Sequence, residues 1–167
     1  MRSLVISELF VALPRLGVSC VRFNFRGVGE SSGTHDGGDA ERLDVLAALD
    51  GFDDDASPLV IAGWSFGADV TLSIDSPTVA GWIAIAPPLR YGNGSEVVAA
   101  DPRPKLVLLA GHDEFRPAAE VEAITAGWTA TTTETVAGAS HFFVGRTDCL
   151  VDLVGTWMSD EVFRNRQ

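Results

Sequence analysis

Short runs of β-forming residues, several of them apolar, alternate with helical patterns along this chain, and the alternation predicts repeated β–α units. The runs cover residues 18–25, 58–63, 80–87, 105–110 and 131–137. The middle three are almost continuously apolar, which is typical of strands covered by helices on both faces. We therefore expect a mostly parallel sheet with right-handed crossovers.

Helical patterns occupy the first 17 residues and three later segments. The helix expected over 39–51 has Asp39 as its candidate N-cap and stops at Gly51. Pro117 lies in the first turn of the helix expected over 116–127. The segment 148–158 has one apolar face, which points to packing against a sheet; its members are Leu150, Leu153, Val154, Trp157 and Met158. With 167 residues, the chain is expected to form one domain over 1–167, a three-layer α/β/α sandwich.

Charge and composition narrow the classes of partner. Twelve Lys and Arg against 23 Asp and Glu give a net charge of -11, which repels nucleic acid and anionic membranes. Glu8 interrupts the first apolar run and no signal-cleavage pattern follows, so we expect a helix and a cytoplasmic protein. Cys20 and Cys149 are isolated and are interpreted as small apolar fillers. We expect no bound nucleic acid, membrane, metal or cofactor, and homo-oligomerisation is left open.

Ser65 lies between two glycines in PLVIAGWSFGADV, residues 58–70. The pattern G-x-S-x-G follows an apolar run and precedes a stretch that can be helical, which is the context of a nucleophile elbow. In such a turn the serine backbone is strained, and side chains at Gly63 and Gly67 would collide with strand and helix. The alternative interpretation is an ordinary strand-to-helix turn.

A serine hydroxyl needs a general base, and three histidines are candidates. His35 lies in a glycine-rich loop upstream of the serine, and His112 directly precedes Asp113. His141 alone follows both the serine and a loop acid, in the chain order Ser, acid, His. We therefore expect His141 as the base and Asp113 as the acid that orients it, with Glu114 as the reserve.

Four stretches together resemble the α/β-hydrolase superfamily, and in particular its small lid-less bacterial members, the esterase-like and dienelactone-hydrolase-like proteins. They are FNFRGVGESSG (23–33), GWSFGA (63–68), GHDEF (111–115) and GASHFF (138–143). By this resemblance Ser65, Asp113 and His141 form a catalytic triad, and the N–H of Phe66 is one oxyanion donor. The first stretch is also similar to a dinucleotide-binding glycine loop. Its spacing, G-x-G-x-x-x-G, and the lack of a ribose-binding carboxylate about 35 residues on argue against that function.

The resemblance also implies strands that precede the first helix, and the chain opens at that helix. In the family a third strand lies between the counterparts of residues 21–25 and 59–63, and its end supplies the second oxyanion N–H. We therefore expect an α/β-hydrolase fold that is truncated at its N-terminus. Three explanations stay open: a true start upstream of Met1, direct pairing of 21–25 with 59–63, or a strand donated by another chain.

The expected function is that of a serine hydrolase that cleaves esters or thioesters of small to medium acyl groups through an acyl-enzyme. Residues 87–104 are too short for a lid domain, so substrate access should be open. Aromatic residues near the expected site could line an apolar pocket, although core packing explains them equally well: Trp64, Phe115, Phe142 and Phe143. The alternatives are a non-catalytic binding or assembly protein and a peptidase for small peptides.

Overall fold

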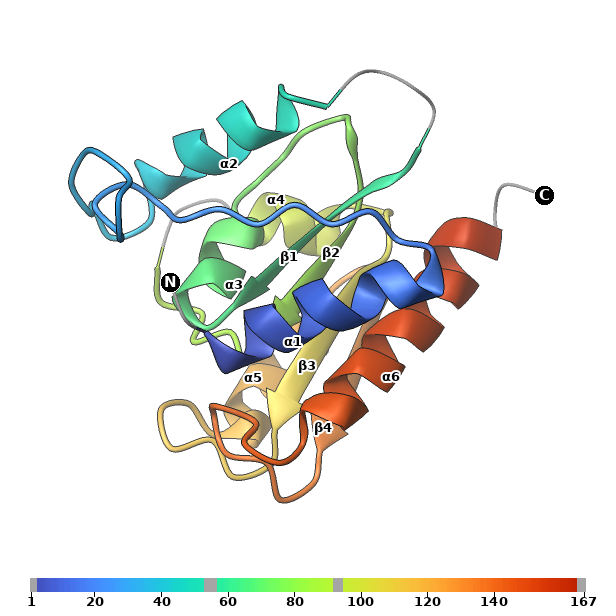
Figure 1. Ribbon diagram of the computed structural model, residues 1–167. Coiled ribbons are helices and arrows are strands. Elements are labelled where there is room, and N and C mark those ends of the chain that lie inside the picture. Colours follow the sequence, from blue (N-terminus) through green and yellow to red (C-terminus); the bar gives the residue numbers. More distant parts are fainter. Residues whose placement is uncertain (1–2, 53–56, 92–94, 165–167) are drawn as a thin grey trace.

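A single parallel sheet of four strands forms the centre of the molecule. The computed structural model describes residues 3–52, 57–91 and 95–164. Within these ranges the strands are β1 (Leu59–Trp64), β2 (Val79–Ile85), β3 (Lys105–Ala110) and β4 (Thr131–Val136), in spatial order β1-β2-β3-β4 (Figure 1). Every neighbouring pair is parallel, as the β–α alternation predicted.

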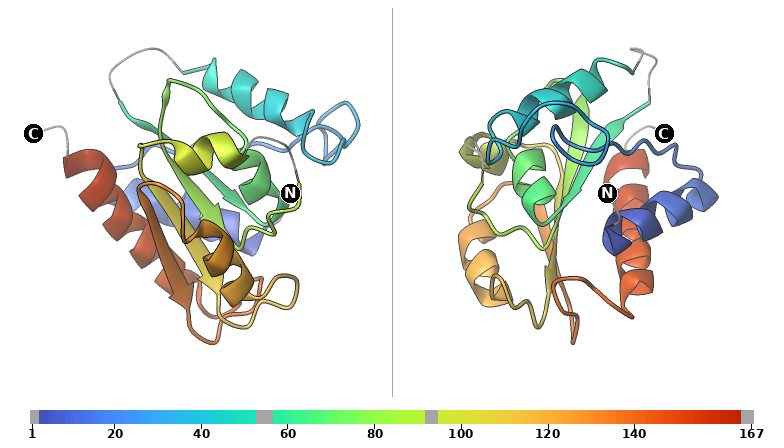
Figure 2. Two further views of the ribbon diagram at one scale, coloured as in Figure 1. Left: turned by 180° about the vertical axis from the view of Figure 1, so that it is seen from behind. Right: turned by 60° about the vertical axis from the view of Figure 1, so that its left-hand side comes forward.

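Helices cover both faces of this sheet, which confirms the three-layer α/β/α architecture. One face carries α1 (Leu4–Ala12), α6 (Thr147–Trp157) and the π-helical turn η2 (Met158–Phe163), and a short 3-10 helix, η1 (Leu13–Leu16), follows α1. The other face carries α2 (Glu41–Leu49), α3 (Phe66–Thr71), α4 (Ser95–Ala100) and α5 (Ala118–Thr125), as the edge-on view in Figure 2 shows.

The alternation of side chains along β2 and β3 divides the core between the two faces. Ile83, Ile85 and Leu108 pack under α1 and α6, whereas Trp82 and Ala84 pack under α2 and α3. Both strands are buried along nearly their whole length. Their continuous apolar runs therefore follow from having a helical layer on each side.

The first expected strand is absent, and this is the main correction to the predicted fold. Residues 18–25 follow an extended course but join no sheet, so one of the three explanations, their direct pairing with 59–63, is wrong. Among the described strands β1 pairs with β2 alone, and its other edge is open. A strand exists only where a neighbour pairs with its backbone hydrogen-bonding groups, and no strand of the described ranges pairs with residues 18–25.

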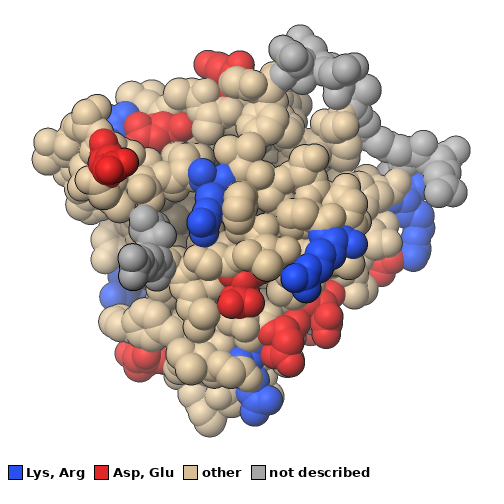
Figure 3. Space-filling view, in the orientation of Figure 1, with Lys and Arg blue, Asp and Glu red and all other residues tan. Residues whose placement is uncertain are grey.

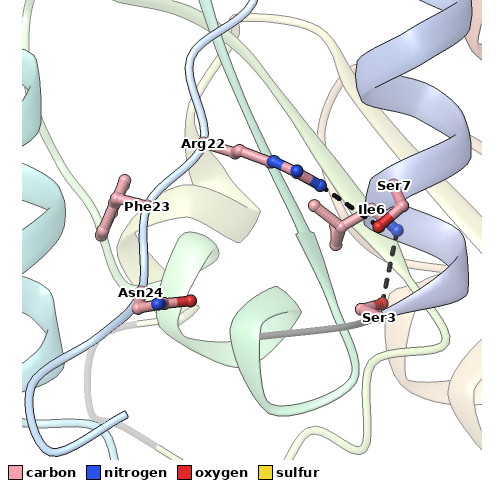
Figure 4. Close-up of a pocket in the computed structure, with 6 residues that line it drawn as sticks. All are labelled: Ser3, Ile6, Ser7, Arg22, Phe23 and Asn24. Carbon is pink, nitrogen blue, oxygen red and sulfur yellow. Dashed lines mark hydrogen bonds between the residues drawn. The ribbon is translucent and has the colours of Figure 1, made fainter. Parts of the chain in front are cut away.

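A hollow of about 210 Å³ lies between α1 and the extended segment (Figure 4). Arg22 reaches across it and donates to the Ser7 hydroxyl at 3.2 Å. The N-cap hydroxyl of Ser3 accepts the Ile6 N–H at its margin. The hollow is lined by Ser3, Ile6, Ser7, Arg22, Phe23 and Asn24.

Two helix starts differ from the prediction. Helix α2 begins one residue later than Asp39 implies, with Ala40 at the N-cap and no capping side chain. The Glu41 carboxylate instead accepts the N–H groups of Asp36 and Gly38. Pro117 is the N-cap of α5, with extended ψ of 132°, rather than a residue of its first turn.

Charged side chains of both signs are interspersed on the face shown in Figure 3. Cys20 and Cys149 are both free thiols and half-buried. Among the helices of the described residues, none combines the length and apolar character needed to cross a membrane.

Candidate active site

Ser65 occupies a sharp turn between the end of β1 and the start of α3. Its backbone has φ of 53° and ψ of -125°, a conformation that costs a residue other than glycine about 1–3 kcal/mol. The two flanking glycines differ in whether a side chain would fit in their place. A Cβ on Gly63 would overlap the Gly67 carbonyl and approach the Ala68 nitrogen at 2.6 Å, whereas a Cβ on Gly67 would meet only the Phe25 ring at 3.8 Å. The steric requirement predicted for both glycines therefore holds for Gly63 alone.

The structure brings Ser65, His141 and Asp113 together in one hydrogen-bonded series. The Ser65 Oγ lies 2.8 Å from Nε2 of His141, and Nδ1 of His141 lies 2.8 Å from Oδ2 of Asp113. A carboxylate only accepts, so Nδ1–H donates to Asp113 and Nε2 is left to accept the serine proton. The side chains of His141 and Asp113 are 5% and 4% exposed. The imidazole is therefore oriented in a site that largely excludes water.

The loop after β3, residues 111–116, is called the acid loop here, and its two carboxylates make different contacts. Oδ1 of Asp113 accepts the N–H groups of Phe115 and Arg116 at 2.8 and 3.1 Å, which leaves Oδ2 for the imidazole. Glu114, the reserve acid, accepts the backbone N–H of His141 at 3.1 Å. Asp113 thus orients the ring, while Glu114 holds the main chain of the same histidine.

Aromatic side chains surround the imidazole of His141. The ring centroids of Phe115, Trp64 and Phe142 lie 4.7, 5.3 and 5.5 Å from it. The indole N–H of Trp64 also donates to the His141 carbonyl at 3.0 Å. Phe115 and Phe142 are 54% and 44% exposed, so they form an open apolar rim. Phe143, expected in the same lining, is instead fully buried in the core under α1 and α6.

Phe66 begins helix α3, so its N–H belongs to the first turn and has no acceptor within the helix. Its ring packs edge-to-face against Phe25, Tyr91 and His35, at centroid distances of 5.8, 5.4 and 5.0 Å. The residue that carries the expected oxyanion donor is therefore held on three sides.

The other candidate residues lie apart from the serine. His35 pairs with Glu41 at 2.8 Å, and His112 is exposed beside the acid loop. Arg26 forms a bidentate ion pair with Asp44 of α2, its shortest contact being 2.7 Å. The side-chain hydrogen bond from Arg26 lowers the pKa of Asp44 below its usual range, although partial burial opposes this. In the described ranges no group of three or more His, Cys, Asp or Glu side chains could hold a metal ion.

Sequence reasoning missed two residues beside the site, Asp69 and Arg90. Asp69 is buried one turn after Ser65, and Arg90 reaches the acid loop. An acid in the otherwise apolar stretch after the elbow was a usable signal for Asp69. Arg90 lies in an irregular loop, where no periodicity distinguishes it from a solvated residue.

Comparison with known proteins agrees with this fold. No family model matches the sequence. The chain is 34% identical to an α/β serine hydrolase homologue from Coxiella burnetii, over 93% of this chain and 76% of that one, with a TM-score of 0.80. It is 30% identical to a lid-less α/β serine hydrolase from Xanthomonas campestris, over 95% and 74% of the two chains, with a TM-score of 0.85. The chain belongs to the α/β serine hydrolase family.

A curated relative, an uncharacterized protein from Rickettsia prowazekii, is 31% identical over 129 residues. The match covers 73% of this chain and 54% of the relative. The chain thus spans about half the length of the curated relative it matches.

Proposed function

We propose that this protein is a serine hydrolase that cleaves carboxylic esters or thioesters through an acyl-enzyme formed on Ser65. The observation that supports this most is the series Asp113, His141, Ser65, with 2.8 Å at each junction. Each atom in it has the role that acyl transfer requires: a hydroxyl to attack, a nitrogen to take its proton and a carboxylate to orient that nitrogen.

In the proposed reaction, Nε2 of His141 takes the Ser65 proton as Oγ attacks the substrate carbonyl. The imidazolium, stabilised by the Asp113 carboxylate, then donates that proton to the leaving alcohol or thiol. Water, deprotonated by the same nitrogen, attacks the acyl carbonyl, and the imidazolium then returns the proton to Oγ as the bond to Ser65 breaks and the acid leaves. In this proposal the N–H of Phe66 donates to the oxyanion of both tetrahedral intermediates, since it belongs to the residue after the nucleophile.

The surroundings of the site favour a small acyl substrate that enters from an open surface. Phe115 and Phe142 offer exposed apolar surface beside the imidazole. Such a rim can contact a short acyl or alkyl chain without enclosing it.

A fluorophosphonate probe tests the proposal, because it phosphonylates only a serine that is activated by a base. We expect the wild-type chain to be labelled and Ser65→Ala to be unlabelled, with both variants showing the same thermal unfolding. Ser159→Ala is the matched control, because Ser159 is exposed and far along the chain from the elbow. It should be labelled like the wild type.

Three substrates of equal acyl length then define the bond cleaved: a p-nitrophenyl ester, a thioester and an amino-acyl anilide. Hydrolysis of the first or second supports the proposal, and preference for the anilide indicates a peptidase. A folded wild-type chain that is neither labelled nor active would favour the remaining alternative, a non-catalytic binding protein.

A further inference from the structure

The carboxylate of Asp69 in helix α3 collects three successive backbone N–H groups of the loop after β2. Leu89 donates to Oδ1 at 2.8 Å, and Arg90 and Tyr91 donate to Oδ2 at 2.7 and 2.9 Å. Asp69 is only 3% exposed. Burial raises its pKa, and the three donors oppose that rise. The loop is therefore fixed to α3 by a carboxylate whose two oxygens both accept hydrogen bonds.

The three hydrogen bonds to Asp69 hold a loop that contains a strained residue. Leu89 has φ of 52°, a conformation that a residue with a side chain adopts only where its surroundings impose it. Asp69 in turn is attached to the nucleophile turn, because its own N–H donates to the Ser65 carbonyl at 3.3 Å. Asp69 thus connects the two segments: its main-chain N–H bonds to Ser65 and its carboxylate accepts from residues 89–91.

The loop of residues 89–91 also contacts the acid loop, which carries Asp113. Nη2 of Arg90 donates to the Phe115 carbonyl at 3.0 Å. The N–H of Phe115 donates to Oδ1 of Asp113 at 2.8 Å, and its ring lies 4.7 Å from the His141 imidazole. Arg90 therefore holds Phe115, one of the two residues whose N–H groups occupy Oδ1 of Asp113 and leave Oδ2 for His141.

We propose that Asp69 and Arg90 are positioning residues that couple the nucleophile turn to the acid loop, so that Asp113 stays aligned with His141. Neither residue touches the reacting atoms. Arg90 fixes the turn at Phe115, and Asp69 fixes the loop from which Arg90 extends. The inference rests on the proposed function, since it concerns the same serine, histidine and aspartate.

The test uses Arg90→Ala in the full chain, because Arg90 is exposed and its loss should leave the fold intact. The readouts are the rate of fluorophosphonate labelling and the kcat and KM for a p-nitrophenyl ester. We expect labelling and kcat to fall about three- to tenfold, the equivalent of one lost hydrogen bond, with KM changed less than about twofold. Arg90→Lys, which can still donate to the Phe115 carbonyl, should recover most of the rate. Arg15→Ala, a distant exposed arginine, should behave as wild type.

A double-mutant cycle separates positioning from a general structural effect. If Arg90 acts through Asp113, adding Arg90→Ala to Asp113→Asn should change the labelling rate by less than about 1.5-fold, since the alignment it supports is already lost. A full, additive loss in that background would overturn the inference.

Asp69→Asn provides a second variant with an expected result of its own. The amide oxygen can still accept from Leu89, but the amide nitrogen cannot accept from Arg90 and Tyr91. We expect a loss of kcat at least as large as that of Arg90→Ala. A reactive wild type whose Arg90→Ala form is equally reactive overturns this inference alone, whereas an unreactive wild type overturns the proposed function as well.

Discussion

Ser65 sits in a strained backbone conformation that its neighbours maintain. With φ of 53°, its side chain leaves the path of both β1 and α3, which puts Oγ within 2.8 Å of His141. In the proposed reaction, the N–H of Phe66, the residue that follows, is the oxyanion donor. We propose that the strained turn at Ser65 thereby supplies both the nucleophile and a donor, while Asp113 comes from a different loop.

Asp113→Asn should reduce kcat by about 10³–10⁴, because an amide at this position no longer holds the imidazole in the required tautomer. Glu114→Gln is the matched control. Its amide oxygen can still accept the His141 N–H, so kcat should stay within about threefold of wild type. Steady-state ester hydrolysis by both variants measures this. Equal losses, or a larger loss for Glu114→Gln, would show that the acid has been assigned to the wrong residue.

Asp44→Asn should change the pH dependence of stability. The hydrogen bond from Arg26 lowers the pKa of folded Asp44, so this pair stabilises the native state above the ordinary aspartate pKa of about 3.9 and ceases to do so as pH falls through the lowered value. The variant should have a lower free energy of unfolding at pH 7 and lose less of it on acidification.

Urea unfolding at pH 7 and pH 3 measures both quantities. Asp152→Asn, at an exposed site on α6, is the control and should follow the wild type at both values. If Asp44→Asn lost as much free energy of unfolding between pH 7 and pH 3 as the wild type, the assigned role of the ion pair would be contradicted.

At the level of single residues, motif context and the chain order Ser, acid, His predicted Ser65, Asp113 and His141 as partners. The sequence could not separate Phe142 from Phe143. The two are adjacent and chemically identical, and only the local backbone decides which one faces the solvent. Phe143 has φ of 52° and turns into the core.

At the scale of elements, the turn from β1 to α3 depends on one glycine more than on the other. Gly63 lies where a methyl group would overlap the backbone of Gly67, and no side-chain rotation relieves an overlap with backbone. Gly67 has room for a methyl group beside Phe25. In the motif G-x-S-x-G of this chain, steric overlap therefore excludes a side chain at the first glycine but not at the second.

Gly63→Ala should lower the free energy of unfolding by about 1–3 kcal/mol or more, because helix α3 must shift away from β1. Gly67→Ala should change it by less than about 1 kcal/mol. Urea unfolding followed by circular dichroism measures both. Equal destabilisation by the two substitutions would contradict the packing described for this turn.

Residues 18–25 show why some elements are not predictable from local pattern. The apolar character of VSCVRFNF fits a strand, but a strand also needs a neighbour, and that neighbour is not encoded in the segment itself. The runs at 80–87, 105–110 and 131–137 became strands because each lies beside another. Helix α4, in a segment expected only to be too short for a lid, has six residues, too few to establish a periodicity.

Hydrogen exchange should distinguish the unpaired segment 18–25 from the paired strands. The amides of residues 18–25 should exchange much faster than those of β3, which lies between two hydrogen-bonded neighbours. Exchange followed by mass spectrometry of peptides from both regions measures this. Protection of residues 18–25 comparable to that of β3 would show that a further strand lies beside them in solution.

At the scale of the whole molecule, the parallel sheet assembles the site from distant parts of the sequence. Ser65 follows β1, Asp113 follows β3 and His141 follows β4, so all three lie at the carboxyl edge of one sheet. The parallel sheet could be anticipated from the β–α alternation, since a strand that follows a helical crossover pairs parallel to the one before it. The link through Asp69 and Arg90 could not, because it joins α3 to two loops whose course depends on packing.

The proposed acyl-enzyme on Ser65 can be trapped and located in the sequence. The wild-type chain is mixed with p-nitrophenyl acetate, quenched in acid within the first turnovers and digested for peptide mass spectrometry. We expect an added acetyl group on the peptide that contains Ser65, and none on that peptide from His141→Ala quenched at the same time. Ester hydrolysis without an acetylated Ser65, or acetylation at another serine, would contradict the proposal.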